Sequence, residues 1–155
     1  MVVELTNPPV PPDAPADVTV RRFQLQQDDK AVYDAHQEIF GDDLGVPRDE
    51  WEDWLEEAFR PEFDPRFWIV AATECAELVG ICLGYPCQAA GEGWISIVGV
   101  RRPWRRQGIA KAIVTAAFAE FWEAGRPRVS LEVDAENLSA IRLYELLGMR
   151  VVSAP

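Results

Sequence analysis

The amino-acid sequence predicts an α/β fold in three layers, a mixed and mostly antiparallel sheet with helices on both faces. Three observations support this prediction. Segments of strand length are rich in β-branched and aromatic residues, longer segments carry apolar residues at helical spacing, and glycines or prolines separate the two kinds. Their order along the chain is β-α-α-β-β-β-α-β-α-β, which favours one sheet covered on both sides.

The chain begins with a segment that is poor in core-forming residues. Residues 7–15 contain five prolines, a composition that favours extended backbone. We therefore expect residues 1–16 to be a proline-rich tail or linker and residues 17–155 to form one domain, which is large enough for a hydrophobic core.

Residue spacing and helix-capping residues predict one strand followed by two helices. Residues 18–25 have the composition of a strand, and residues 28–40 form an amphipathic helix with Asp28 at its negatively charged start. Pro47 suits the first turn of a second helix over 48–59. Four apolar residues of that helix fall on one face, Trp51, Trp54, Leu55 and Phe59.

The remaining elements follow in close succession. The expected strands are 66–73, 77–86, 93–100, 128–135 and 149–152, and the expected helices are 108–125 and 138–147. The first two of these strands form a hairpin, because only a short turn joins them. Gly125 and Gly148 end the helices, and Asn137 caps the second one. The strand at 149–152 has no hairpin partner, so we expect the final strand to be incomplete.

Charge and apolar runs exclude several classes of protein. The net charge is −11, and residues 28–64 hold fourteen acidic and three basic residues, so the whole excess lies there. A nucleic-acid-binding protein would be basic, so no nucleic-acid partner is expected. No apolar run reaches the ~20 residues of a membrane span, and no signal peptide is evident, so we expect no membrane partner and a cytoplasmic location.

The cysteines and the histidine do not form a metal or nucleophile motif. Cys75, Cys82 and Cys87 contain no CxxC pair, and His36 is distant from them in sequence, so we expect no metal and no disulfide framework. No GxSxG elbow accompanies His36, and we interpret it as a structural residue.

The segment 98–113 has the pattern of an anion site. An apolar strand ends at 98–100, a turn follows, and Gly108 opens a long helix. A helix N-terminus presents unpaired amides and a positive dipole end, and glycine allows close approach of an anion. Five basic side chains lie in this turn, Arg101, Arg102, Arg105, Arg106 and Lys111. The alternative is that they form only a solvated run of charge.

Two motifs in this part of the chain resemble those of the GNAT superfamily of N-acetyltransferases. Arg105-x-x-Gly108-x-Ala110 matches the [Q/R]-x-x-G-x-[G/A] pattern of that family. Farther along, Asn137-x-x-Ala140-x-x-x-Tyr144-x-x-x-Gly148-Met149 is similar to the family's N-x-x-A-x-x-x-Y-x-x-x-G-F block. The resemblance covers about residues 17–152, and residues 66–152 are also similar to mycothiol-synthase-like tandem members.

The resemblance implies acetyl-CoA as cosubstrate and a direct attack on it by a primary amine. The amides of about 105–110, with Lys111, would bind the pyrophosphate, and the main chain at 98–100 would pair with the pantetheine arm where the strands splay apart. Asn137 would contact that arm or serve only as a cap, and Tyr144 would protonate the leaving thiolate or be only a core aromatic. The cofactor residues so implied are Val98, Gly99, Val100, Arg105, Arg106, Gln107, Gly108, Ile109, Ala110, Lys111, Asn137 and Tyr144.

The sequence departs from the family pattern at the general base. Family members often carry a glutamate on the strand before the cofactor turn, but residues 94–97 here contain no carboxylate. Glu92 and Glu132 are candidate bases, the alternative being that both are surface carboxylates, and a water chain held by Ser96 is a third candidate. The second departure is the incomplete final strand, which leaves the acceptor site to be completed by residues outside this sequence or by a partner subunit, so a homodimer is left open.

The acidic excess leads to an expectation about the acceptor. The corresponding segment of the family walls the acceptor side, where a negative field attracts cations. We therefore expect a cationic small-molecule or peptide amine, the alternative being that the acids only solubilise two surface helices. A non-catalytic acyl-CoA-binding module and one half of a tandem protein remain alternative functions.

Overall fold

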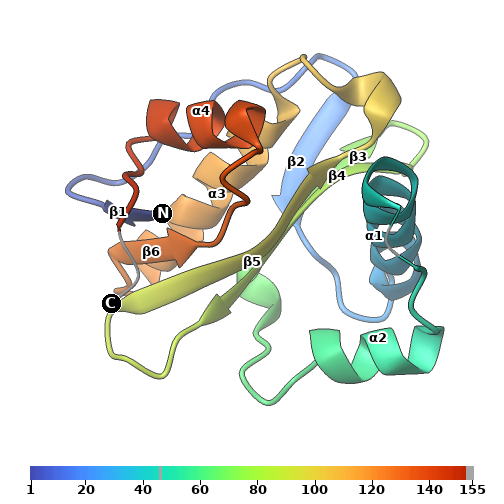
Figure 1. The fold of residues 1–155 in the computed structure, drawn as a ribbon, viewed down its shortest axis with the longest axis horizontal. Coiled ribbons are helices and arrows are strands. Elements are labelled where there is room, and N and C mark those ends of the chain that lie inside the picture. The colour runs from blue at the N-terminus through green and yellow to red at the C-terminus, as the bar shows by residue number, and fades with distance from the viewer. Residues whose placement is uncertain (46, 153–155) are drawn as a thin grey trace.

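The computed structural model describes residues 1–45 and 47–152, and it contains one six-stranded sheet between two layers of helices (Figure 1). The strands are β1 (Val2–Glu4), β2 (Val18–Arg22), β3 (Trp68–Thr73), β4 (Leu78–Pro86), β5 (Glu92–Val100) and β6 (Arg128–Leu131). The α-helices are α1 (Asp29–Leu44), α2 (Trp51–Ala58), α3 (Ile109–Glu123) and α4 (Leu138–Leu146), and the 3-10 turns are η1 (Pro65–Phe67) and η2 (Arg102–Trp104). The predicted fold class is confirmed.

The strand order explains how one strand comes to carry the site. The sheet runs β1-β6-β5-β4-β3-β2, with β5 and β6 parallel and the other neighbours antiparallel. Parallel strands need a crossover, and α3 supplies it between β5 and β6. The predicted hairpin of β3 and β4 is present. Within the described residues, no helix has the length and apolar character to cross a bilayer.

Each face of the sheet has its own apolar core. One core packs α3 and α4 against one face of the sheet, and Phe67 and Phe121 stack there with ring centroids 4.5 Å apart. The other packs α1 and α2 against the opposite face around Trp54 and Trp68. Glycine is required at Gly93, because a Cβ there would lie 2.4 Å from the Phe121 ring.

The N-terminal residues belong to the sheet, which corrects the expected tail over 1–16. Val2 and Val3 are buried, and β1 pairs antiparallel with β6. Val2 also exchanges two main-chain hydrogen bonds with Arg150, at 2.9 and 2.8 Å, so the segment at 149–152 does have a neighbour. The contact was missed because the apolar run is short and its partners are more than 120 residues away. The expected strand at 149–152 is reduced to this single bridge.

Several element boundaries differ from the expected ones. Helix α2 begins at Trp51 because Glu50, in an extended conformation, is its N-cap. The first strand ends at Arg22, and α1 continues to Leu44. The change that matters for function is in β6, which ends at Leu131 although the alternating pattern continues to residue 135.

Candidate active site

Strands β5 and β6 diverge halfway along β5. Their pairing runs from Glu92↔Arg128 to Ile95↔Leu131 and then stops, while β5 continues to Val100. Ser96 is exposed and residues 97–99 are only half-buried, although β5 lies inside the sheet. We call this opening along residues 96–100 the β5–β6 splay, and it lies beside the turn that leads into α3 (Figure 1).

The main chain of Val98 points into the splay. The amide of Arg101 donates to the Val79 carbonyl at 2.8 Å, and in an antiparallel pair alternate residues point toward the same neighbour. Gly99 and Arg101 therefore face β4, whereas Val98 and Val100 face the splay. The Val100 carbonyl accepts from Nε of Arg105 at 2.9 Å, and the described residues provide no partner for the main chain of Val98.

Gly99 has a packing role on the opposite face of the sheet. A Cβ at Gly99 would lie 2.8 Å from Cγ2 of Ile39, so glycine lets α1 approach β5 closely. Its expected contact with a cosubstrate would involve only the main chain.

The turn between β5 and α3 leaves the helix amides exposed. Arg106 and Gly108 have positive φ angles of 64° and 84°, and no side chain caps the helix. The amides at 109–111 have no acceptor one turn earlier within the helix, and nothing lies within 4 Å of the place where a Gly108 Cβ would be. This arrangement suits a phosphate group.

The side chains predicted around this turn divide into two groups. Ile109 is buried and Ala110 packs against the core, so both offer only their amides. Four other predicted residues present exposed surface, Arg102, Arg106, Gln107 and Lys111. Arg101 instead pairs with Glu38 of α1 at 2.8 Å and with Glu77 at 3.4 Å, so it ties the end of β5 to its neighbours.

Helix α4 contributes Asn137 and Tyr144. The Asn137 side chain accepts from the Ala140 amide at 3.1 Å, so the expected cap is present. Tyr144 is buried against the core, and burial raises the pKa of its hydroxyl. Its hydroxyl makes no hydrogen bond within the described residues. The hydroxyl is not among the fully enclosed polar atoms of the described residues, so it is available to a ligand.

The three candidate bases occupy different places. Glu92 begins β5 and lies 3.3 Å from Nε of Arg128, roughly 13 Å along the strand from Ser96 at 3.3 Å per residue. Glu132 is exposed just after β6. Ser96 alone lies at the splay, at a bulge where Leu83 pairs with Ile97 and Gly84 with Ile95.

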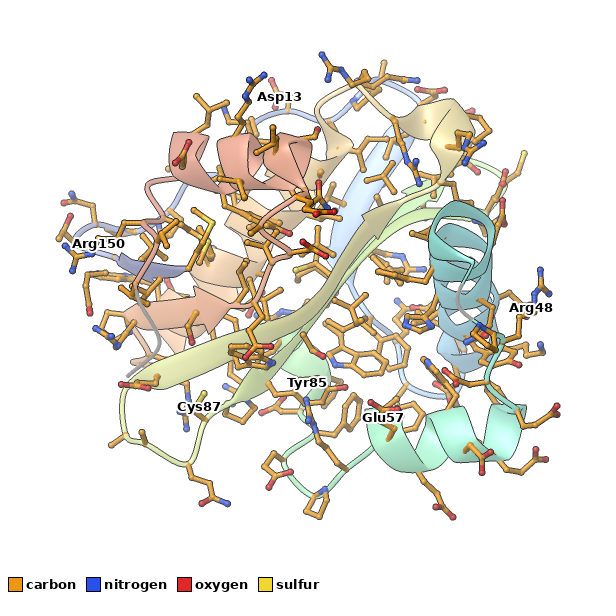
Figure 2. The ribbon with its side chains drawn as sticks, viewed as in Figure 1. Asp13, Arg48, Glu57, Tyr85, Cys87 and Arg150 are labelled. Carbon is orange, nitrogen blue, oxygen red and sulfur yellow. The ribbon has the colours of Figure 1, made fainter. Side chains whose placement is uncertain are left out.

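The bulge also forms the floor of a pocket on the other face of the sheet. Two consecutive residues, Ser96 and Ile97, point to that face because the bulge interrupts the alternation. The pocket has a volume of about 150 Å³, and we call it the α2 pocket. Its polar walls include His36, Asp49, Glu57, Arg60 and Tyr85. Figure 2 shows Glu57 of α2 and Tyr85 of β4 near each other at this site.

Sequence reasoning missed most of the α2 pocket. His36 was interpreted as structural, but its half-buried ring lines the pocket. The one feature of the sequence that pointed to this pocket is the acidic pair of helices, which was expected to form a wall of the acceptor site. In the described residues no group of three histidine, cysteine or acidic side chains is arranged to hold a metal ion.

An open strand edge beside an uncapped helix N-terminus is an arrangement suited to an extended ligand that ends in phosphates. Comparison with known families agrees with this class. The model of the acetyltransferase (GNAT) family matches residues 30–149, and the chain belongs to that family.

The chain resembles mycothiol acetyltransferases in sequence. It is 29% identical to that of Nocardiopsis dassonvillei over 157 residues, covering 94% of this chain and 46% of the relative. It is 33% identical to that of Streptomyces scabiei over 140 residues, covering 90% and 45%. The chain thus spans about half the length of the curated relatives that it matches.

Solved structures show the same fold. A GCN5-related N-acetyltransferase from Sphaerobacter thermophilus superposes with a TM-score of 0.86 at 38% identity, covering 97% of this chain and 47% of that one. A diaminobutyrate acetyltransferase from Paenibacillus lautus, solved with 2,4-diaminobutyric acid and coenzyme A, has a TM-score of 0.64 at 22% identity, covering 84% and 74%.

Proposed function

We propose that this unit transfers the acetyl group of acetyl-CoA to a primary amine by direct attack of the amine. The observation that carries the proposal is the β5–β6 splay, where the unpaired main chain of Val98 lies next to the uncapped start of α3. An extended pantetheine arm pairs with such a strand edge, and its pyrophosphate suits the amides of the turn. The residues present therefore fit the cosubstrate.

The roles of the residues follow from where they lie. The Val98 amide is placed to donate to the thioester carbonyl and to stabilise the oxyanion that develops there. The amine nitrogen forms a bond to the carbonyl carbon, and the carbon–sulfur bond then breaks. The Tyr144 hydroxyl, protonated because its burial raises its pKa, donates to the departing thiolate. Water held by Ser96 takes the proton that the ammonium loses before attack. The second proton, which the nitrogen loses after attack, replaces the one that Tyr144 gives to the thiolate, and no covalent enzyme intermediate is needed.

The charge distribution supports a cationic acceptor. The acidic segment 28–64 includes α1 and α2, which cover the sheet face that holds the α2 pocket. A negative field on this side and basic side chains around the turn would draw a cationic amine and an anionic cosubstrate to opposite sides of β5.

One observation favours a second candidate function. Residues 93–100 contain no carboxylate, and Glu92 is engaged with Arg128. A unit without a base could bind acyl-CoA without turning it over, as a regulatory module or as one half of a tandem protein would.

Two measurements on one sample separate these functions. Calorimetric titration with acetyl-CoA tests the site, and release of CoA thiol in the presence of an amine panel tests catalysis. Binding with amine-dependent release supports transfer, and binding with no release from any amine supports the regulatory module. Absence of binding would refute both.

A further inference from the structure

A hydrogen-bond chain on α1 fixes the tautomer of His36. The main-chain amide of Asp49 donates to Oε1 of the buried Gln37 at 2.9 Å, which fixes the orientation of the Gln37 amide. Nε2 of Gln37 then lies 3.1 Å from Nδ1 of His36. An amide nitrogen can only donate, so Nδ1 must accept. The neutral imidazole therefore carries its proton on Nε2.

The surroundings of the ring keep it neutral. His36 lies between Phe40, with ring centroids 4.9 Å apart, and Trp54, at 6.3 Å. Burial lowers the pKa of His36 and outweighs the opposing influence of the Asp49 and Glu57 carboxylates. A protonated ring would also direct an Nδ1–H toward the donor of Gln37. The ring is thus unsuited to serve as a general base, since its only lone pair is already used.

Nε2 of His36 is free to meet a ligand in the α2 pocket. It makes no hydrogen bond within the described residues, and it is not among their fully enclosed polar atoms. The Arg60 guanidinium also lines the pocket and stacks on Tyr85, with its central carbon 3.6 Å from the ring centroid. Nε of Arg60 is fully enclosed, so it is not offered to a ligand. Because the Nε2–H of His36 can only donate, a ligand with an oxygen acceptor suits this site.

We propose that Gln37 holds His36 as the Nε2–H tautomer so that His36 donates a hydrogen bond to an oxygen atom of the acceptor amine. His36 is then a specificity-determining residue and Gln37 a positioning residue. The acceptor belongs to the amines that also carry hydroxyl, carbonyl or carboxylate oxygens, such as amino sugars and amino acids, and simple polyamines are poor substrates. This inference rests on the proposed function, because the ligand of His36 is an acceptor only if the protein transfers an acetyl group to it.

The tautomer is tested first, without any need for turnover. His36 is the only histidine in the chain, so a two-bond proton–nitrogen correlation spectrum of the labelled protein shows one imidazole. We expect the Nε2–H pattern in the natural protein. Gln37→Glu keeps an oxygen for the Asp49 amide but turns the donor into an acceptor, so its spectrum should change to Nδ1–H or imidazolium. An Nδ1–H pattern in the natural protein would overturn the inference.

Specificity is tested with glucosamine and cyclohexylamine, two ring amines that differ in oxygen content. We expect kcat/KM to favour glucosamine, and His36→Phe to reduce that preference about tenfold, the equivalent of roughly one hydrogen bond. Where the Gln37→Glu spectrum shows the Nδ1–H tautomer, which lacks the Nε2–H donor but keeps the ring, that variant should reduce the preference as well; an imidazolium would keep the donor and the preference. A preference unchanged in both variants would overturn the proposal.

The same spectra separate failure of this inference from failure of the proposed function. If no amine is acetylated, the proposed function fails, and addition of the two amines to the CoA-bound protein still reports on His36. Signals of His36 that shift with glucosamine and not with cyclohexylamine support the donor role. Equal shifts, or none, would refute it.

Discussion

Tyr144→Phe is expected to lower activity and to leave stability nearly unchanged. The substitution removes one hydroxyl, on a buried ring, that has no hydrogen-bond partner within the described residues and is not fully enclosed by them. Because no hydrogen bond within the protein is lost, the free energy of unfolding should change by less than about 0.5 kcal/mol. For a domain of this size that corresponds to a change in Tm of less than about 2 °C. Turnover should fall about 10–1000-fold if the hydroxyl donates to the departing thiolate.

Tyr85→Phe is the matched control for the stability measurement. Its hydroxyl is also in a buried side chain, but it donates to the Ala58 carbonyl at 2.9 Å. Removing it should lower the free energy of unfolding by about 1 kcal/mol. The assays are thermal unfolding of both variants and CoA release by Tyr144→Phe. Calorimetry should show that Tyr144→Phe retains its affinity for acetyl-CoA. A clearly destabilised Tyr144→Phe, or one with unchanged turnover while chemistry limits the rate, would refute the assignment.

Three further predictions test other parts of the site. Gly108→Val should abolish acetyl-CoA binding in calorimetry, because residue 108 has a φ of +84° and its side chain would enter the space of the anion. Gly125→Ala is the control: it is also strained, at a φ of +71°, but it is distant from the turn and should only lower Tm. Raising salt from ~20 to ~500 mM shortens the screening length from roughly 20 Å to under about 5 Å, so kcat/KM for a cationic acceptor should fall several-fold, and a rate that ignores salt would contradict the charge argument. A thiol reagent should label exposed Cys75 in the folded protein but label Cys82, whose pKa burial raises, only after unfolding, as peptide mapping would show.

The parts of the site that were predictable from sequence are those made by local main-chain geometry. The turn before α3 needs a positive φ at residue 108 and an uncapped helix start, and both appear in the sequence as a glycine after a strand. The cap at Asn137 and the stop at Gly148 are equally local. Such features depend on a few neighbouring residues, so their spacing is visible in one sequence.

The parts that were missed depend on contacts between distant segments. The pairing of Val2 with Arg150 joins opposite ends of the chain. The bulge at Ser96 is a difference in register between β4 and β5, and neither strand shows it alone. The orientation of His36 depends on a glutamine whose partner is a main-chain amide twelve residues away. No pattern along one element contains this information.

The bulge on β5 is the feature that lets a single strand serve two ligands. Without it, strict alternation would send Ser96 and Ile97 to opposite faces of the sheet. With it, both side chains line the α2 pocket, while the main chain of Val98, one residue later, points along the sheet into the β5–β6 splay. An amine in the pocket and a thioester in the splay would then both be positioned by the backbone of residues 96–98 and would meet beside it. Because that backbone is held by β4 and by α1 packed on Gly99, the relative position of the two ligands would be set by the rigid sheet and not by a loop.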